Sequence, residues 1–231
     1  MLHFESLGYR CIAFDRRGHG RSDDPCNGYD FDTLSRDVED VLDALDLRDI
    51  ILVAHSMGGA EAQRYVSRFN DKGRVKKLIL LAAPECLARS ADNPDGVDPE
   101  FSEIGLRQIA EDFTKWIDEN TYPFYLADKF GVSDGIVRWS IDMMMQTSLW
   151  VAINCRRAIF YADLRPDARR IDVPTLVIHG DADASIPFWC GQSLSRNIPG
   201  CVFKPYAGAP HGLIISHARQ IREDILEFIK D

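Results

Sequence analysis

A serine in a tight turn of small residues is the first group in this sequence that suggests chemistry. Ser56 stands in the run AHSMGG (54–59), after the apolar run IILV and before a helical pattern. The run matches the nucleophile-elbow pattern G-x-S-x-G, with alanine in the first glycine position. Such a turn presents the hydroxyl at the start of a helix, where the Met57 N–H is placed to donate to an oxyanion. The alternative is a Ser-Gly loop that only caps a helix; the flanking strand and helix favour the elbow.

A nucleophile of this kind needs a carboxylate and a histidine, which follow the serine in that order on loops after later strands. The loop GDADASIP (180–187) carries two acidic candidates, Asp181 and Asp183. The loop GAPHG (208–212) places His211 just ahead of the last helical pattern. An imidazole at this position accepts the Ser56 proton while the carboxylate orients the ring. Spacing alone leaves both aspartates open.

Other histidines fit the role of base less well. We expect His55 to point away from its neighbour Ser56, and His179, at the end of a strand, to be structural. His19 lies in an early turn and His217 on the last helix. A histidine on the loop after the last strand is where the base is required, which selects His211.

The elements that must position these loops alternate along the chain. Short apolar runs predict strands at 10–14, 50–53, 75–82, 173–180 and 202–205. Helical periodicity predicts helices at about 31–45, 58–69, 188–196 and 213–229. We therefore expect one α/β domain over 1–231, a mostly parallel sheet flanked by helices, with a mainly helical cap inserted at about 84–163.

Charge and composition exclude several classes of function. Acidic residues outnumber basic ones by 36 to 27, and the net charge of −9 argues against a nucleic-acid partner. The longest apolar run (78–83) is far short of the roughly 20 residues of a membrane span, so we expect no membrane association and a cytoplasmic protein. The 6 cysteines form no CxxC pair and are expected to be reduced. The sequence does not indicate an oligomeric state.

Four segments carry a resemblance that covers nearly the whole chain: GYRCIAFDRRGHGRSD, LVAHSMGGAEAQRYV, DVPTLVIHGDADASIP and AGAPHGL. In these the chain resembles the cofactor-free (non-haem) haloperoxidase and aryl esterase group of the α/β-hydrolases. The resemblance implies Ser56 as nucleophile, His211 as base and Asp183, rather than Asp181, as the acid. It implies small carboxylic esters as substrates, peracid formation with peroxide in some members, and no metal, haem or other cofactor.

The resemblance also suggests where the substrate binds. It makes five residues in the cap candidates for a hydrophobic acyl or alcohol pocket: Trp139, Met143, Met144, Met145 and Trp150. The competing interpretation is ordinary packing of the cap on the sheet, for which methionine and aromatic residues are common.

One departure from the family pattern concerns the oxyanion hole. Family members carry a further N-terminal region with additional strands and an HG-aromatic-P loop that donates a second N–H, and no such segment precedes Ser56 here. We therefore expect the N-terminal strands and the second donor to be missing, and the 231-residue chain to be a poor enzyme compared with an extended form. The alternative function is a catalytically impaired binding protein of the same fold. A lactone substrate is a further option, whereas epoxide hydrolysis normally uses an aspartate where this chain has Ser56.

Overall fold

The computed structural model describes residues 1–230, and its centre is a parallel sheet of four strands in the order β1-β2-β3-β4. The strands are β1 (Ile50–His55), β2 (Val75–Leu81), β3 (Thr175–Gly180) and β4 (Val202–Tyr206). All three pairings are parallel, with Ala54 beside Leu80, Leu81 beside Ile178 and Gly180 beside Tyr206. The four carboxyl ends therefore meet at one edge, which brings the loops after β1, β3 and β4 together.

Helices cover both faces of the sheet because the strand residues alternate between them. Leu78 and Leu80 pack with Val177 against α2 (Phe31–Ala44), α3 (Met57–Arg68) and α10 (Phe188–Asn197). Ile79 and Ile178 pack on the other face against α12 (Ala218–Lys230). Nearly every residue of β2 and β3 is buried, as expected for strands covered on both sides. The predicted parallel sheet flanked by helices is confirmed.

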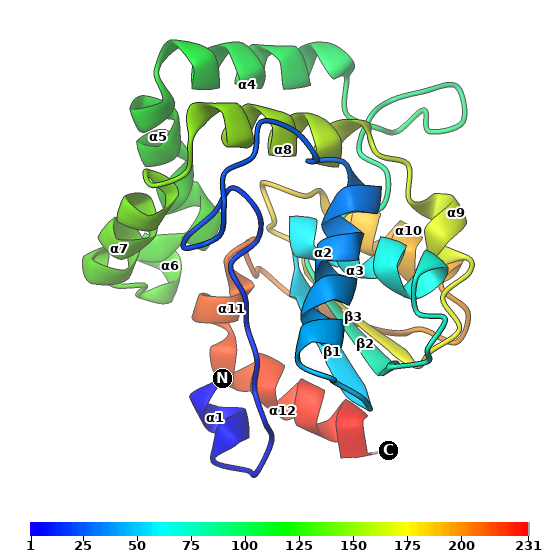
Figure 1. Ribbon diagram of the computed structural model, residues 1–231. Helices are drawn as coiled ribbons and strands as arrows, with labels where there is room; N and C mark the ends of the chain where they lie inside the picture. The colour runs from blue at the N-terminus through cyan, green and yellow to red at the C-terminus, as the bar shows by residue number, and fades with distance from the viewer. Residues whose placement is uncertain (231) are drawn as a thin grey trace.

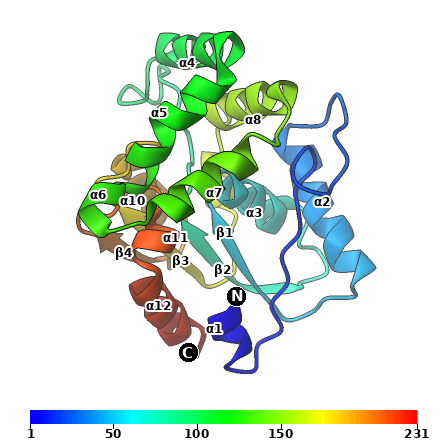
Figure 2. The ribbon, with the colours of Figure 1, turned by 90° about the vertical axis from the view of Figure 1, so that its left-hand side faces the viewer.

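A separate group of helices lies beside the sheet in both views (Figures 1 and 2). It consists of α4 (Pro99–Glu111), α5 (Phe113–Tyr125), α6 (Ala127–Phe130), α7 (Asp134–Met144) and α8 (Leu149–Tyr161). Val151 and Cys155 of α8 pack against Met57 and Tyr29, which joins this group to the helix that follows Ser56. The short helix α9 (Arg165–Ala168) then leads back to β3.

Two predicted elements differ from the structure. The predicted strand at 10–14 is wrong: after α1 (Leu2–Glu5) this segment has no strand pairing, and Ile12 and Phe14 are 40% and 42% exposed. An apolar run makes a strand only where a neighbour supplies hydrogen bonds, and none of the described strands lies beside this one. The predicted helix 213–229 is divided into α11 (Leu213–Ser216) and α12, because the backbone of His217 leaves the helical region.

Candidate active site

Ser56 occupies a strained turn between β1 and α3. Its backbone has φ 54° and ψ −125°, outside the regions that non-glycine residues favour. Two backbone hydrogen bonds hold this conformation: the Ser56 N–H donates to the carbonyl of Leu81 at 2.9 Å, and the Gly59 N–H donates to the carbonyl of Ser56 at 2.8 Å. A Cβ at Gly59 would stand 2.4 Å from the Cβ of Ala83, so this helix approaches the end of β2 closely only because the residue is glycine.

His211 joins Ser56 to Asp183. Its Nε2 lies 2.8 Å from Oγ of Ser56, and its Nδ1 lies 2.7 Å from Oδ2 of Asp183. The carboxylate is only an acceptor, so Nδ1 carries hydrogen and Nε2 is left to accept the hydroxyl hydrogen of Ser56. The His211 side chain is 3% exposed and that of Asp183 fully buried. The three residues come from the ends of β1, β3 and β4 and form one hydrogen-bonded chain.

Asp183 and Asp181 have different surroundings. Oδ1 of Asp183 accepts the backbone N–H groups of Ser185 and Ile186, each at 2.8 Å. Burial would raise the pKa of the Asp183 carboxyl, but hydrogen bonds from His179, His211 and the backbone more than offset it and lower the pKa. Asp181 is exposed, and its carboxylate accepts the backbone N–H of Gly208 instead. Asp183 is the one of the two that contacts His211.

Two ring side chains hold the His211 loop from behind. His55 does not bond to Ser56; its Nε2 donates to the backbone carbonyl of His211 at 2.9 Å, and the two ring centroids are 4.8 Å apart. Burial and the neighbouring His211 lower the pKa of His55 to about 4. Phe124, at the end of α5, lies edge-on to His211, and its carbonyl accepts the Gly212 N–H at 2.7 Å. Neither contact was predicted, since both join residues far apart in the chain.

Met57 is the first residue of α3, so its N–H has no acceptor within the helix and lies at the positive end of the helix dipole. Its side chain is buried against Tyr29 and Val151. The position is the one that an oxyanion donor after the nucleophile requires.

The five residues predicted to line a hydrophobic pocket are exposed. Exposed fractions on or next to α7 are 60% for Trp139, 43% for Met143, 36% for Met144 and 37% for Met145. Trp150 is 51% exposed, and its Nε1 donates to the carbonyl of Cys26 at 2.9 Å. Trp150 lines a hollow of about 610 Å³ between the loop that precedes α2 and the outer side of α8. Whether the five residues contact a substrate stays a prediction.

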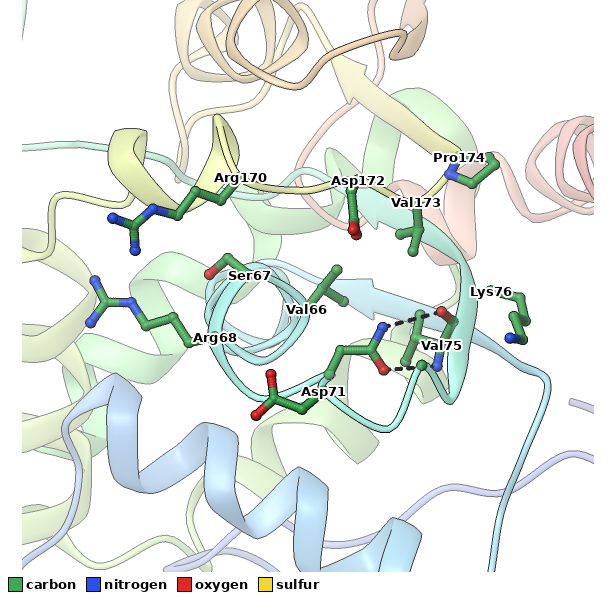
Figure 3. Close-up of a pocket in the computed structure, with 12 residues that line it drawn as sticks. Val66, Ser67, Arg68, Asp71, Val75, Lys76, Arg170, Asp172, Val173 and Pro174 are labelled. Carbon is green, nitrogen blue, oxygen red and sulfur yellow. Dashed lines mark hydrogen bonds between the residues drawn. The ribbon is translucent and has the colours of Figure 1, made fainter.

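Figure 3 shows a second hollow, of about 520 Å³. It is formed by the end of α3 and the segments that begin β2 and β3, with Arg68 and Arg170 on one side and Asp172 between them and Lys76. Ser56 follows the carboxyl end of β1, and these residues lie at the amino ends of parallel strands. This hollow is therefore at the opposite edge of the sheet from the candidate site.

Residues 1–230 lack two features that would indicate other kinds of site. No cluster of three or more histidine, cysteine, aspartate or glutamate side chains in that range has the arrangement of a metal site. No helix in the same range is both long and apolar enough to span a membrane.

Comparison with known proteins identifies relatives over the whole chain. The family model described as "alpha/beta hydrolase fold" matches residues 2–188, which include Ser56 and Asp183. A non-heme chloroperoxidase from Streptomyces lividans is 40% identical, over 100% of this chain and 85% of its own length. A bifunctional esterase/perhydrolase from Acinetobacter calcoaceticus is 31% identical with the same coverage. A bromoperoxidase structure from Bacillus anthracis superposes with a TM-score of 0.93 at 35% identity, covering 98% of this chain and 83% of that one.

Proposed function

Because the chain belongs to the α/β hydrolase fold family, we propose that it hydrolyses small carboxylic esters through an acyl-enzyme on Ser56. The observation that carries the proposal is the hydrogen-bonded chain from Ser56 Oγ through the His211 ring to Asp183 Oδ2, with distances of 2.8 and 2.7 Å. The esterase/perhydrolase relative supports a small ester as the substrate class.

Acylation begins with attack of Ser56 Oγ on the ester carbonyl carbon. His211 Nε2 takes the hydroxyl proton as the new C–O bond forms, and the carbonyl oxygen becomes an oxyanion that accepts the Met57 N–H. His211 then gives that proton to the alkoxide leaving group, and the alcohol departs. Asp183 stabilises the imidazolium that exists between these two transfers and keeps Nε2 directed at Ser56.

Deacylation repeats the sequence with water. His211 removes a proton from water as its oxygen attacks the acyl carbon, then returns the proton to Ser56 Oγ, which releases the carboxylic acid. Hydrogen peroxide in place of water attacks the same carbon and gives a peracid with regeneration of the serine hydroxyl. The names of the chloroperoxidase and esterase/perhydrolase relatives support this second reaction as a side activity.

A fluorophosphonate probe tests the proposal most directly, because it labels a serine only when that serine is activated. We expect labelling of the wild-type protein and none of Ser56→Ala. A series of p-nitrophenyl esters of increasing acyl length, with and without peroxide, then measures substrate range and perhydrolysis. A folded wild-type protein that is neither labelled nor active would instead favour the binding-protein alternative.

A further inference from the structure

A second histidine lies on the far side of Asp183 from His211. His179 is the fifth residue of β3, and its side chain is fully buried on the face of the sheet that α10 covers. The ring packs against Gly191 of α10, where a Cβ would stand 2.5 Å from Nδ1, and edge-on to Phe188, with 6.0 Å between ring centroids. The imidazole is thus packed closely against α10.

The surroundings of His179 determine which nitrogen carries hydrogen. Its Nε2 lies 3.0 Å from the carbonyl oxygen of Ile186 and 3.4 Å from Oδ2 of Asp183, and both oxygens are acceptors only. Nδ1 is buried, with no hydrogen-bond partner among the described residues. Hydrogen on Nδ1 would have no acceptor, whereas hydrogen on Nε2 has two, so the network assigns the Nε2–H tautomer.

Ile186 connects His179 to the carboxylate a second time. Its carbonyl accepts from His179, while its own N–H donates to Oδ1 of Asp183 at 2.8 Å. Ile186 thereby binds the turn that carries Asp183 to the end of β3. The contact of His179 Nε2 with the Ile186 carbonyl is shorter than its contact with Asp183 and is the principal hydrogen bond. The contact at 3.4 Å adds the positive end of the N–H dipole beside Oδ2, the same oxygen that faces His211.

We propose that His179 is a positioning residue for the hydrolysis proposed above, on which this inference rests. Its Nε2–H fixes the turn at Ile186 and lies beside Oδ2 of Asp183, so that this oxygen is held in place to accept hydrogen from Nδ1 of His211. Oδ2 is thus flanked by two imidazoles, one that reaches Ser56 and one that does not. His179 touches neither the nucleophile nor the reacting ester and acts through Asp183.

The Nε2–H of His179 also weakens Asp183 as an acceptor and so limits how strongly this carboxylate stabilises a proton on His211. With His179 removed, Oδ2 becomes a stronger acceptor for the imidazolium, so the acid limb of the kcat/KM profile moves to higher pH. The other titratable groups that face this cluster are His55, against the His211 ring, and the Cys190 thiol of α10, whose pKa burial raises. Both stay in place in the variants below.

The test compares two substitutions at one position. His179→Leu keeps the bulk and removes the donor, and His179→Gln places an amide N–H near the position of Nε2. We expect His179→Leu to lose roughly ten- to a hundredfold in kcat, by analogy with residues that orient metal-bound histidines, with KM within about twofold. Its acid limb should rise by about half a pH unit or more. We expect His179→Gln to recover most of kcat and the wild-type limb.

A control separates positioning from stability. Ile198→Ala shortens a buried side chain of the apolar cluster at the end of α10 and removes no side-chain hydrogen bond, so it should lower Tm while leaving kcat and the pH profile unchanged. Ring ¹⁵N NMR of the wild-type protein, assigned with His179→Gln, should give the Nε2–H tautomer and needs no folded leucine variant. The proposal would be overturned if His179 carried hydrogen on Nδ1. It would also be overturned if His179→Leu had the kcat of the wild-type protein and the same acid limb in its kcat/KM profile. Wild-type protein without esterase activity or probe labelling would overturn the proposed function itself.

Discussion

The ring of Phe124 lies edge-on against the imidazole of His211, with 5.0 Å between the centroids and 78° between the planes. Phe124 belongs to α5, outside the sheet, and its carbonyl also binds the N–H of Gly212. The helical group beside the sheet therefore contacts the proposed base directly. The position of α5 and the orientation of His211 depend on each other.

We expect Phe124→Ala to lower kcat about tenfold, because the freed imidazole no longer keeps Nε2 directed at Ser56. Steady-state kinetics on a p-nitrophenyl ester measures the effect. Phe130→Ala is a matched control: Phe130 lies in the same apolar cluster and packs on His217, 4.8 Å between centroids, away from the site. Equal losses in the two variants would show that only stability is affected.

The two aspartates of the loop after β3 should differ sharply on substitution. Asp183→Asn leaves a neutral amide beside Nδ1 of His211 and removes the charge that stabilises the imidazolium, so we expect a loss of about 10³- to 10⁴-fold in kcat. Asp181→Asn changes a carboxylate that binds the Gly208 N–H and should stay within about threefold of wild type. The reverse ranking would assign the acid to Asp181.

Ser56→Ala and His211→Ala should each nearly abolish ester turnover, by about 10⁶-fold in kcat over a complete triad, because the two residues act as one unit. The double variant should then be within about threefold of either single variant. Measured losses that multiply instead would mean that the residues act independently.

The lowered pKa of His55 predicts that the protein is less stable in acid. The unfolded chain binds a proton at this residue near pH 6.5 and the folded protein only near pH 4, so the free energy of unfolding falls as pH drops through that window. The loss is about 2 kcal/mol. Urea unfolding at pH 7 and pH 4.5 should show a smaller loss in His55→Gln, which retains a donor for the His211 carbonyl and does not titrate.

Glu61 should act in the opposite direction. This buried carboxylate of α3 is paired with Arg16 at 2.7 Å, and burial raises its pKa to about 7 in spite of the pair. The folded protein thus keeps a proton that the unfolded chain releases near pH 4.5, and the free energy of unfolding falls as pH rises from about 4.5 to about 7. The contribution of Glu61 to the difference in the free energy of unfolding between pH 5 and pH 8 is about 2 kcal/mol. Glu61→Gln should lack this contribution. An unchanged difference would place the pKa near its ordinary value.

Local patterns predicted much of this structure and missed the rest for a physical reason. The apolar runs that became β1 to β4, and the loops that carry Ser56, Asp183 and His211, depend on alternation and turn residues that a short window contains. The segment 10–14 has the same kind of pattern but no partner strand. Whether a partner strand lies beside a segment depends on the tertiary structure, which a short window of sequence does not contain. His55, Phe124 and His179 likewise gain their roles from residues distant in the sequence. The position of His55 next to Ser56 in the sequence suggested that it lies near the site, but it did not predict the hydrogen bond to the His211 carbonyl.

The hydrogen bond between Ser56 and His211 closes a loop of 155 residues, while the bond from His211 to Asp183 closes one of 28. Contacts at such separation form late, because a chain must lose much conformational freedom before the contact repays it, and parallel sheets fold slowly for the same reason. Asp183 and His211 therefore meet within a local unit, whereas Ser56 joins them only when β1 to β4 are in register. During refolding, helical signal should return ahead of turnover, so the proposed ester hydrolysis would report the completed topology rather than compactness.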